Sequence, residues 1–137
     1  MKRGAGILLI KDGNVLLVKA GVKSLQADGS IAFPGGHVDF EETEKETARR
    51  EFTEETGLVA GDLIDFPGNY VEARVERKDG WADFSFKVFL TQNYTGELRA
   101  TDETEPIWVN IEEARKMKLY GKNNQILEAA IRFLKSK

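Results

Sequence analysis

The 137-residue sequence contains no cysteine, one histidine and three prolines. Without cysteine it has no disulfide framework, no thiolate metal site and no cysteine nucleophile. The single histidine, His37, excludes the usual zinc site built from several histidines, so a bound metal would need oxygen ligands. The first apolar run, residues 5–10, is too short for a signal peptide core or a membrane span. We therefore expect a cytoplasmic protein that does not enter a membrane.

The composition is that of one folded domain. Apolar residues make up 41% and charged residues 31% of a chain whose length is typical of a single domain, so we expect residues 1–137 to form one domain. The net charge of −3 is unevenly distributed, because residues 39–55 hold eight acidic and three basic side chains. This distribution offers no electrostatic basis for binding a nucleic acid duplex.

Hydrophobic alternation and turn residues predict a chain made mostly of strands. Asp12-Gly13 lies between two β-rich runs and is a strong hairpin signal, and residues 70–77 and 81–90 alternate as a second hairpin with one buried face. The expected strands are 5–10, 15–19, 31–33, 70–77, 81–90 and 106–109, with a loop over 20–30, and the expected helices are 43–56, 111–118 and 123–134. Because strands and helices do not alternate strictly, this order favours an α/β (α+β) sandwich with a mixed sheet over a doubly wound fold.

The helix expected over residues 43–56 has both ends encoded locally. Thr43 followed by Glu46 fits a capping box, and Gly57 fits the left-handed position after the last turn. Just before this helix, the stretch Pro34-Gly35-Gly36 predicts a turn that ends a strand and lets the backbone approach an occupant closely. A backbone carbonyl in that turn would be a neutral oxygen ligand.

Three glutamates crowd one turn of this helix. Glu51, Glu54 and Glu55 stand at positions i, i+3 and i+4, and we expect the basic pair Arg49-Arg50 to project to another side. Helical glutamates usually form a solvated face, but like charges this close oppose folding unless a cation binds among them. Mg²⁺ and Mn²⁺ prefer such oxygen ligands. The loop spacing of a calcium-binding hand is absent.

Residues 36–58 resemble the Nudix box, Gly-x5-Glu-x7-Arg-Glu-U-x-Glu-Glu-x-Gly-U, in which U is a bulky apolar residue. Every defined position matches, as follows: Gly36, Glu42, Arg50, Glu51, Phe52, Glu54, Glu55, Gly57 and Leu58. The strand order is also similar to that of MutT-type members of the family. The resemblance implies an α/β/α sandwich with a mixed sheet between helices.

The resemblance also implies the chemistry. Members of the Nudix family hydrolyse a nucleoside diphosphate linked to another moiety, using Mg²⁺ or Mn²⁺ and an attacking water. By matching positions, the metal ligands would be Glu51, Glu54, Glu55 and the carbonyl of Gly35. Arg50 would pair with Glu42 or a neighbouring glutamate and so hold the ligands in place.

The residue that accepts the proton from water is open between two regions. In the family it is a box glutamate, for which Glu54 is the candidate here, or an acid on the loop before the Trp-Val strand, here Trp108-Val109. That loop contains three acids, of which we favour Glu103 as base or auxiliary ligand. The other two are Glu105 and Asp102.

Two residues are expected to bind the substrate. Lys19 ends the second strand where the family often has a basic residue facing phosphates, and Asn123 resembles the asparagine that reads a purine edge in MutT-type enzymes, although it also suits a helix cap. Tyr70 and Trp81 are candidates for stacking on a base, but packing within the hairpin suits both better. His37 occupies a variable position of the box and is assigned no chemistry.

The resemblance leaves the substrate open. The small size and the absence of the marks of ADP-ribose and coenzyme A hydrolases favour an enzyme that converts a (deoxy)nucleoside triphosphate to its monophosphate and pyrophosphate. The alternatives are hydrolysis of a dinucleoside polyphosphate, a nucleotide sugar or ADP-ribose, and a non-catalytic module that senses nucleotides. The expected partner is a small nucleotide, and because family members are often dimers, a homodimer is a further expectation.

Overall fold

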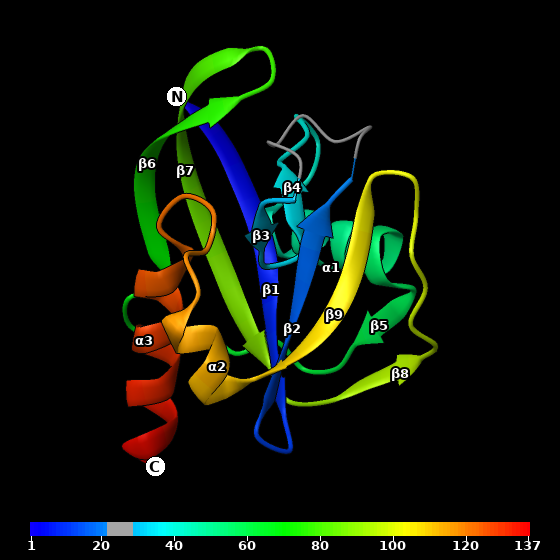
Figure 1. Ribbon diagram of the computed structural model, residues 1–137, viewed down its shortest axis with the longest axis vertical. Coiled ribbons are helices and arrows are strands. Elements are labelled where there is room, and N and C mark those ends of the chain that lie inside the picture. The colour runs from blue at the N-terminus through cyan, green and yellow to red at the C-terminus, as the bar shows by residue number, and fades with distance from the viewer. Residues whose placement is uncertain (22–28) are drawn as a thin grey trace.

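The computed structural model describes residues 1–21 and 29–137, and its strands and helices form a sandwich (Figure 1). The strands are β1 (Lys2–Lys11), β2 (Asn14–Ala20), β3 (Ile31–Ala32), β4 (Gly35–His37), β5 (Leu58–Ala60), β6 (Tyr70–Arg77), β7 (Gly80–Thr91), β8 (Tyr94–Gly96) and β9 (Thr104–Asn110). The helices are α1 (Glu44–Thr56), α2 (Ile111–Lys116) and α3 (Asn123–Lys135). Among the described residues, no helix combines the length and apolar character needed to cross a membrane.

The main sheet is mixed and is organised around β1. This strand runs parallel to β7 from Lys2 to Leu9, and antiparallel to β4 and to β2 at its two ends. β6 extends the sheet beyond β7, whereas β3 and β9 both pair with β2. β5 and β8 form a separate two-stranded sheet.

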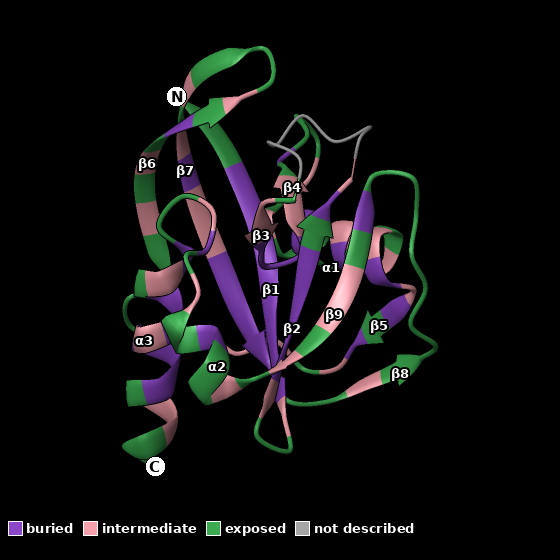
Figure 2. Cartoon of the chain, in the orientation of Figure 1, coloured by how far each residue is buried: buried purple, intermediate pink, exposed green. Residues whose placement is uncertain are grey.

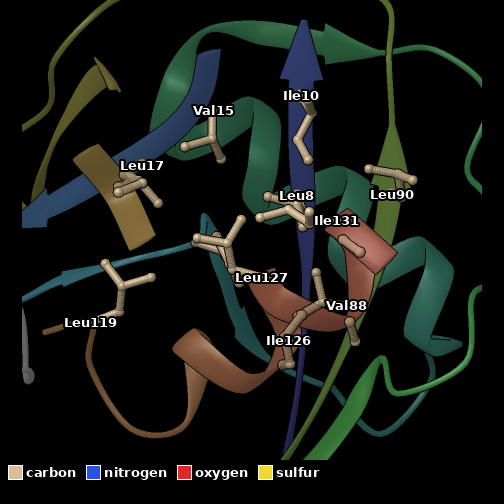
Figure 3. Packing of buried hydrophobic residues seen from close by; sticks show 14 of the residues in the cluster. Leu8, Ile10, Val15, Leu17, Val88, Leu90, Leu119, Ile126, Leu127 and Ile131 are labelled. Atoms are coloured by element: carbon tan, nitrogen blue, oxygen red, sulfur yellow. The ribbon is translucent and has the colours of Figure 1, made fainter. Parts of the chain in front are cut away.

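Helices cover both faces of the main sheet. On one face Leu8, Leu90 and Val88 pack against Ile126 and Leu127 of α3 (Figure 3). The other face packs against α1, in a second cluster that contains Ile7, Leu9, Leu16, Ala48, Phe52 and Phe89. Successive residues of β1 therefore enter different cores, as expected for a strand buried on both sides. The expected sandwich with a mixed sheet between helices is confirmed.

Helix α1 begins and ends where its sequence predicts. The Thr43 side chain accepts a hydrogen bond from the Glu46 backbone N–H at 3.1 Å, and the Glu46 side chain accepts one from the Thr43 N–H at 2.9 Å. At the other end Gly57 adopts the left-handed conformation with φ of 81°. Both ends are thus set by local chemistry.

The turn expected at residues 34–36 is limited to a bend at Pro34. Gly35–His37 forms β4, which pairs with β1 through Gly6, Ala5 and Gly4. The pairing is very close, because a Cβ atom on Gly35 would lie 2.6 Å from the Ala5 carbonyl oxygen. The glycine thus permits a tight strand contact.

The second expected hairpin, β6 and β7, is present, but its expected buried face is only partly buried. Figure 2 shows β1 buried along its middle, whereas β6 alternates between intermediate and exposed residues. Val71 and Ala73, on the apolar face of β6, are of intermediate burial, and only Val75 is buried. Most of the loop expected over 20–30 lies outside the described residues. The short strands β5 and β8 were not predicted from the sequence.

Removal of the α1 cap provides a test of how this helix is fixed. We expect Thr43→Ala to lower the free energy of unfolding by about 1 kcal/mol, because the Glu46 N–H loses its acceptor. Thr43→Ser keeps the hydroxyl and serves as the matched control, which should stay close to the parent. Urea unfolding measures both variants, and equal losses in the two would contradict the capping role.

Candidate metal and nucleotide site

A pocket of about 580 Å³ lies beside the apolar face of β6 and β7. One end is acidic and contains Glu51, Glu55 and Glu103, next to the glycines of β4. The wall beyond is apolar and is formed by Val71, Ala73, Val75, Phe84 and Phe86. The segment from Tyr120 to Asn123, which leads into the first residue of α3, lines it as well. The volume is within the usual range for small-molecule sites.

The acidic end is built by pressing α1 against β4. Glu55 accepts a hydrogen bond from the Gly35 backbone N–H at 2.7 Å. Glu51 packs directly on Gly36, since a Cβ atom there would come within 2.7 Å of both carboxylate oxygens. A side chain at position 36 would therefore displace the Glu51 carboxylate.

Arg50 holds the glutamates together, and its predicted direction is wrong. Its guanidinium donates two hydrogen bonds to Glu42, at 2.7 and 2.8 Å, and one to Glu51 at 2.9 Å. A longer bond of 3.3 Å reaches Glu54. Its partners lie both before the helix and within it, and simple helical angles do not predict this arrangement. Arg49 instead donates to the Ala60 carbonyl at 2.9 Å.

The Arg50 pairing changes the charge properties of its partners. Hydrogen bonds from Arg50 and then Thr47 lower the pKa of Glu42 to about 2. The bond to Glu42 in turn raises the pKa of Arg50. Both groups therefore stay charged, and the pair acts as a fixed brace.

Glu55 has the opposite behaviour. Burial, followed by the charges of Glu51, Glu103 and Glu54, raises its pKa to about 8, although the Gly35 N–H opposes the shift. Burial also raises the pKa of Glu51. Removing these groups from water without a cation disfavours their charged forms.

Of the three acids expected on the loop before the Trp-Val strand, one lies at the pocket, and Glu105 belongs to β9 itself. Glu103 is a lining residue, whereas Asp102 and Glu105 are not among the described residues that line it. The loop is fastened to α1, because Thr104 Oγ1 donates to the Glu55 carbonyl at 3.2 Å. The Glu103 carbonyl also accepts a hydrogen bond from the Gly21 N–H at 2.7 Å.

Two other predicted site residues lie elsewhere. The Glu54 side chain is 57% exposed and contacts Arg50, and it is not among the described lining residues of the pocket. Lys19 is exposed on β2 with Glu105 opposite it on β9, and it too is outside the described lining. Its strand position therefore does not bring the Lys19 ammonium to this pocket.

Asn123 does line the pocket, but it is no helix cap. It is the first residue of α3, and the cap position belongs to Lys122. Its side-chain oxygen accepts a hydrogen bond from the Phe33 N–H at 3.3 Å, and its amide donates to the Tyr120 carbonyl at 2.5 Å. Asn123 thereby ties α3 to the chain just before β4.

The hairpin residues considered for stacking point away from this pocket. Tyr70 and Trp81 are 48% and 60% exposed and alternate with the lining residues along their strands. The pocket is also lined by residues that the sequence did not suggest for binding, among them Lys2, Arg77, Phe84, Phe86, Tyr120 and Lys122. The alternation of apolar and polar residues along β6 and β7 indicated that their apolar side chains share one face. It did not indicate whether that face lines a pocket or packs into the core.

The donor set of the acidic end fits a hard divalent cation. Its carboxylates and the neighbouring backbone carbonyl of Gly35 are all oxygen donors. Among the described residues, however, no three acidic or histidine side chains converge closely enough to form a finished site. Arg50 and the Gly35 N–H hold the carboxylates instead. Since each carboxylate keeps free lone pairs beside these hydrogen bonds, a cation would bring the carboxylates closer together than they lie in this structure.

Comparisons with known proteins agree with the motif and the fold. The family model described as NUDIX domain matches residues 1–130. A CTP pyrophosphohydrolase from Escherichia coli K12 is 27% identical over 124 residues, which cover 89% of this chain and 85% of the relative. The asymmetrical bis(5'-nucleosyl)-tetraphosphatase of Mus musculus is 30% identical over 102 residues, covering 74% and 69%.

The fold comparison gives the same result. The crystal structure of a MutT NUDIX hydrolase from Burkholderia pseudomallei superposes with a TM-score of 0.79 at 25% identity, covering 93% of this chain and 96% of that one. The chain belongs to the NUDIX domain family. It is a Nudix pyrophosphohydrolase, and its particular substrate is considered below.

The raised pKa of Glu55 predicts how the metal-free protein responds to pH. The folded protein keeps a proton on Glu55 up to about pH 8, whereas the unfolded chain loses it near 4.5, so unfolding releases a proton between these values. The free energy of unfolding should therefore fall as pH rises through this range. Glu55→Gln removes this contribution and should gain thermal stability over the parent as pH increases.

Thermal unfolding of both proteins in chelator, at several values from about pH 5 to about pH 8, measures the difference. Glu41→Gln, at an exposed position before α1, is the control and should follow the parent. Parallel curves for the parent and Glu55→Gln would show that Glu55 titrates as an ordinary carboxyl.

Proposed function

We propose that this enzyme hydrolyses a (deoxy)nucleoside triphosphate to the monophosphate and pyrophosphate with Mg²⁺ or Mn²⁺. The observation that carries the proposal is one pocket that joins an acidic end to an apolar wall containing Phe84 and Phe86. Such a pocket suits a molecule with a polyphosphate at one end and a flat base at the other. The relative named as a CTP pyrophosphohydrolase supports this substrate class.

The acidic end would hold the cation. We propose Glu51, Glu54, Glu55 and the Gly35 carbonyl as ligands, since their oxygens suit Mg²⁺ or Mn²⁺. A cation bound there neutralises the charge of the phosphates and lowers the pKa of water. Arg50 keeps Glu42 and Glu51 in place through its three short hydrogen bonds.

We propose Glu103 as the residue that accepts the proton from the attacking water, with Glu54 as the alternative. Glu103 lines the acidic end, and its loop is attached to α1 by the bond from Thr104 to the Glu55 carbonyl. A base must lie close to the water whose proton it takes. Glu54, exposed and bound to Arg50, is better placed to reach an ion at the outer edge of the site.

The main test is a panel of nucleotides with Mg²⁺, in which the released products are identified. The panel contains nucleoside triphosphates, dinucleoside polyphosphates, nucleotide sugars and ADP-ribose. We expect triphosphates to give monophosphate and pyrophosphate. Glu54→Gln should lower kcat/KM by at least about 100-fold, as expected when a metal ligand is lost.

Glu41→Gln, with an exposed side chain before the helix, is the matched control for this substitution and should retain activity. Unchanged turnover in Glu54→Gln would overturn the mechanism. Preferred cleavage of a dinucleoside polyphosphate would replace the proposed substrate. Tight nucleotide binding without hydrolysis of any panel member would show a sensing module.

A second prediction concerns the close packing of Glu51 on Gly36. Gly36→Ala places a Cβ atom where the Glu51 carboxylate lies, so the carboxylate must move. We expect divalent cation binding to weaken about 10- to 100-fold, the usual effect of disturbing a ligand's surroundings. Calorimetric titration with Mn²⁺ measures the affinity, and circular dichroism verifies the fold. An unchanged affinity in a folded variant would exclude Glu51 as a ligand.

A further inference from the structure

Arg77 is the last residue of β6 and contributes to the pocket away from the glutamates. It lies on the same strand face as Val71, Ala73 and Val75, which form the apolar wall. Its side chain is only 13% exposed, which is unusual for an arginine near a hairpin turn. A charged group is thus enclosed beside an apolar wall.

The guanidinium of Arg77 has little to bind within the protein. Its Cζ atom lies 5.4 Å from the centre of the Phe84 ring, and its Nε atom lies 3.6 Å from an Asp79 carboxylate oxygen. Among the described residues it forms no hydrogen bond and no closer ion pair. Among the described residues, every buried side-chain nitrogen has a hydrogen-bond partner. The unpaired nitrogens of Arg77 are therefore not buried, and they face the pocket or solvent.

The neighbouring side chains favour a ligand that accepts hydrogen bonds. Lys2 and Lys122, which also line the pocket, carry only donors. The Tyr120 hydroxyl already donates to the Glu76 carbonyl at 3.0 Å, and the Asn123 oxygen already accepts from Phe33. The terminal nitrogens of Arg77 therefore form the free fork in this part of the pocket.

A guanidinium fork binds best to two acceptors that lie side by side. Guanine presents such a pair in O6 and N7, which arginine reads in nucleic acids. Cytosine presents one in O2 and N3. Adenine places an amino group beside each of its outer ring acceptors, and uracil places an N–H between its two carbonyls, so neither matches the fork on its Watson–Crick or Hoogsteen edge.

We propose that Arg77 is a specificity-determining residue, which selects bases that present two adjacent acceptors. The enzyme would then prefer guanine and cytosine nucleotides to adenine and uracil nucleotides. This inference depends on the proposed function, because it assumes that the base occupies the apolar part of the pocket. The cation–π contact with Phe84 holds the guanidinium beside the pocket wall.

The kinetic test compares kcat/KM for GTP, CTP, ATP and UTP in the parent, Arg77→Met and Arg77→Lys. We expect the preference for GTP or CTP over ATP and UTP to fall about 5- to 100-fold in both variants, because lysine keeps the charge but not the fork. Arg74→Met, an exposed position on the opposite face of β6, is the matched control and should keep the parent's preference. A preference retained in folded Arg77→Met overturns the proposal.

A binding test separates this inference from the catalytic proposal. Calorimetric titration of the metal-free protein with GMP, CMP, AMP and UMP measures base selection without turnover. Stronger binding of GMP or CMP, lost in Arg77→Met and Arg77→Lys but retained in Arg74→Met, supports the role of Arg77 even if no nucleotide is hydrolysed. Equal binding of the four monophosphates, together with equal hydrolysis of the four triphosphates, overturns the selection while leaving the proposed function intact.

Discussion

The structure depends above all on the close contact between α1 and the two glycines of β4. The Gly35 N–H donates to Glu55, and Glu51 occupies the space that a side chain at Gly36 would need. Two carboxylates thereby become partly buried at one end of the pocket. The same packing fixes the neighbouring Gly35 carbonyl relative to α1. Most oxygen donors of the site thus come from one helix and one strand, and Glu103 joins them from the loop before β9.

This contact brings several carboxylates together and partly buries them, which disfavours their charged forms, and Arg50 offsets this effect for only some of them. Arg50 lowers the pKa of Glu42 through short hydrogen bonds and also binds Glu51. Glu55 receives only the Gly35 N–H, and burial raises its pKa to about 8. The charge of Glu42 is therefore compensated within the protein, whereas burial raises the pKa of Glu51 and of Glu55. A cation bound beside Glu55 would favour its charged form, which links metal binding to the stability of α1 on β4.

The sequence was sufficient to predict features encoded by neighbouring residues. The cap at Thr43, the end at Gly57 and the two hairpins depend on local chemistry, and each is present. Helical angles mispredicted the direction of Arg50, because they describe only the helix and Glu42 lies before it, whereas the Nudix resemblance had named Glu42 as a partner. β4 was missed because its pairing with β1 is a long-range contact. Whether an apolar strand face meets a core or a ligand is likewise decided by distant elements.

Phe86 connects the two ends of the site. Its ring lies over β1 and β4, where a Cβ atom on Gly6 or Gly35 would come within 2.8 or 2.9 Å of the ring. The same ring is part of the apolar pocket wall. A residue in the wall therefore rests on the strand whose backbone contacts Glu55. Since packed interiors have little free space, a movement of this ring toward the sheet would press on the backbone at Gly35. The apolar wall and the strand that carries Gly35 are thus in direct contact through one aromatic ring.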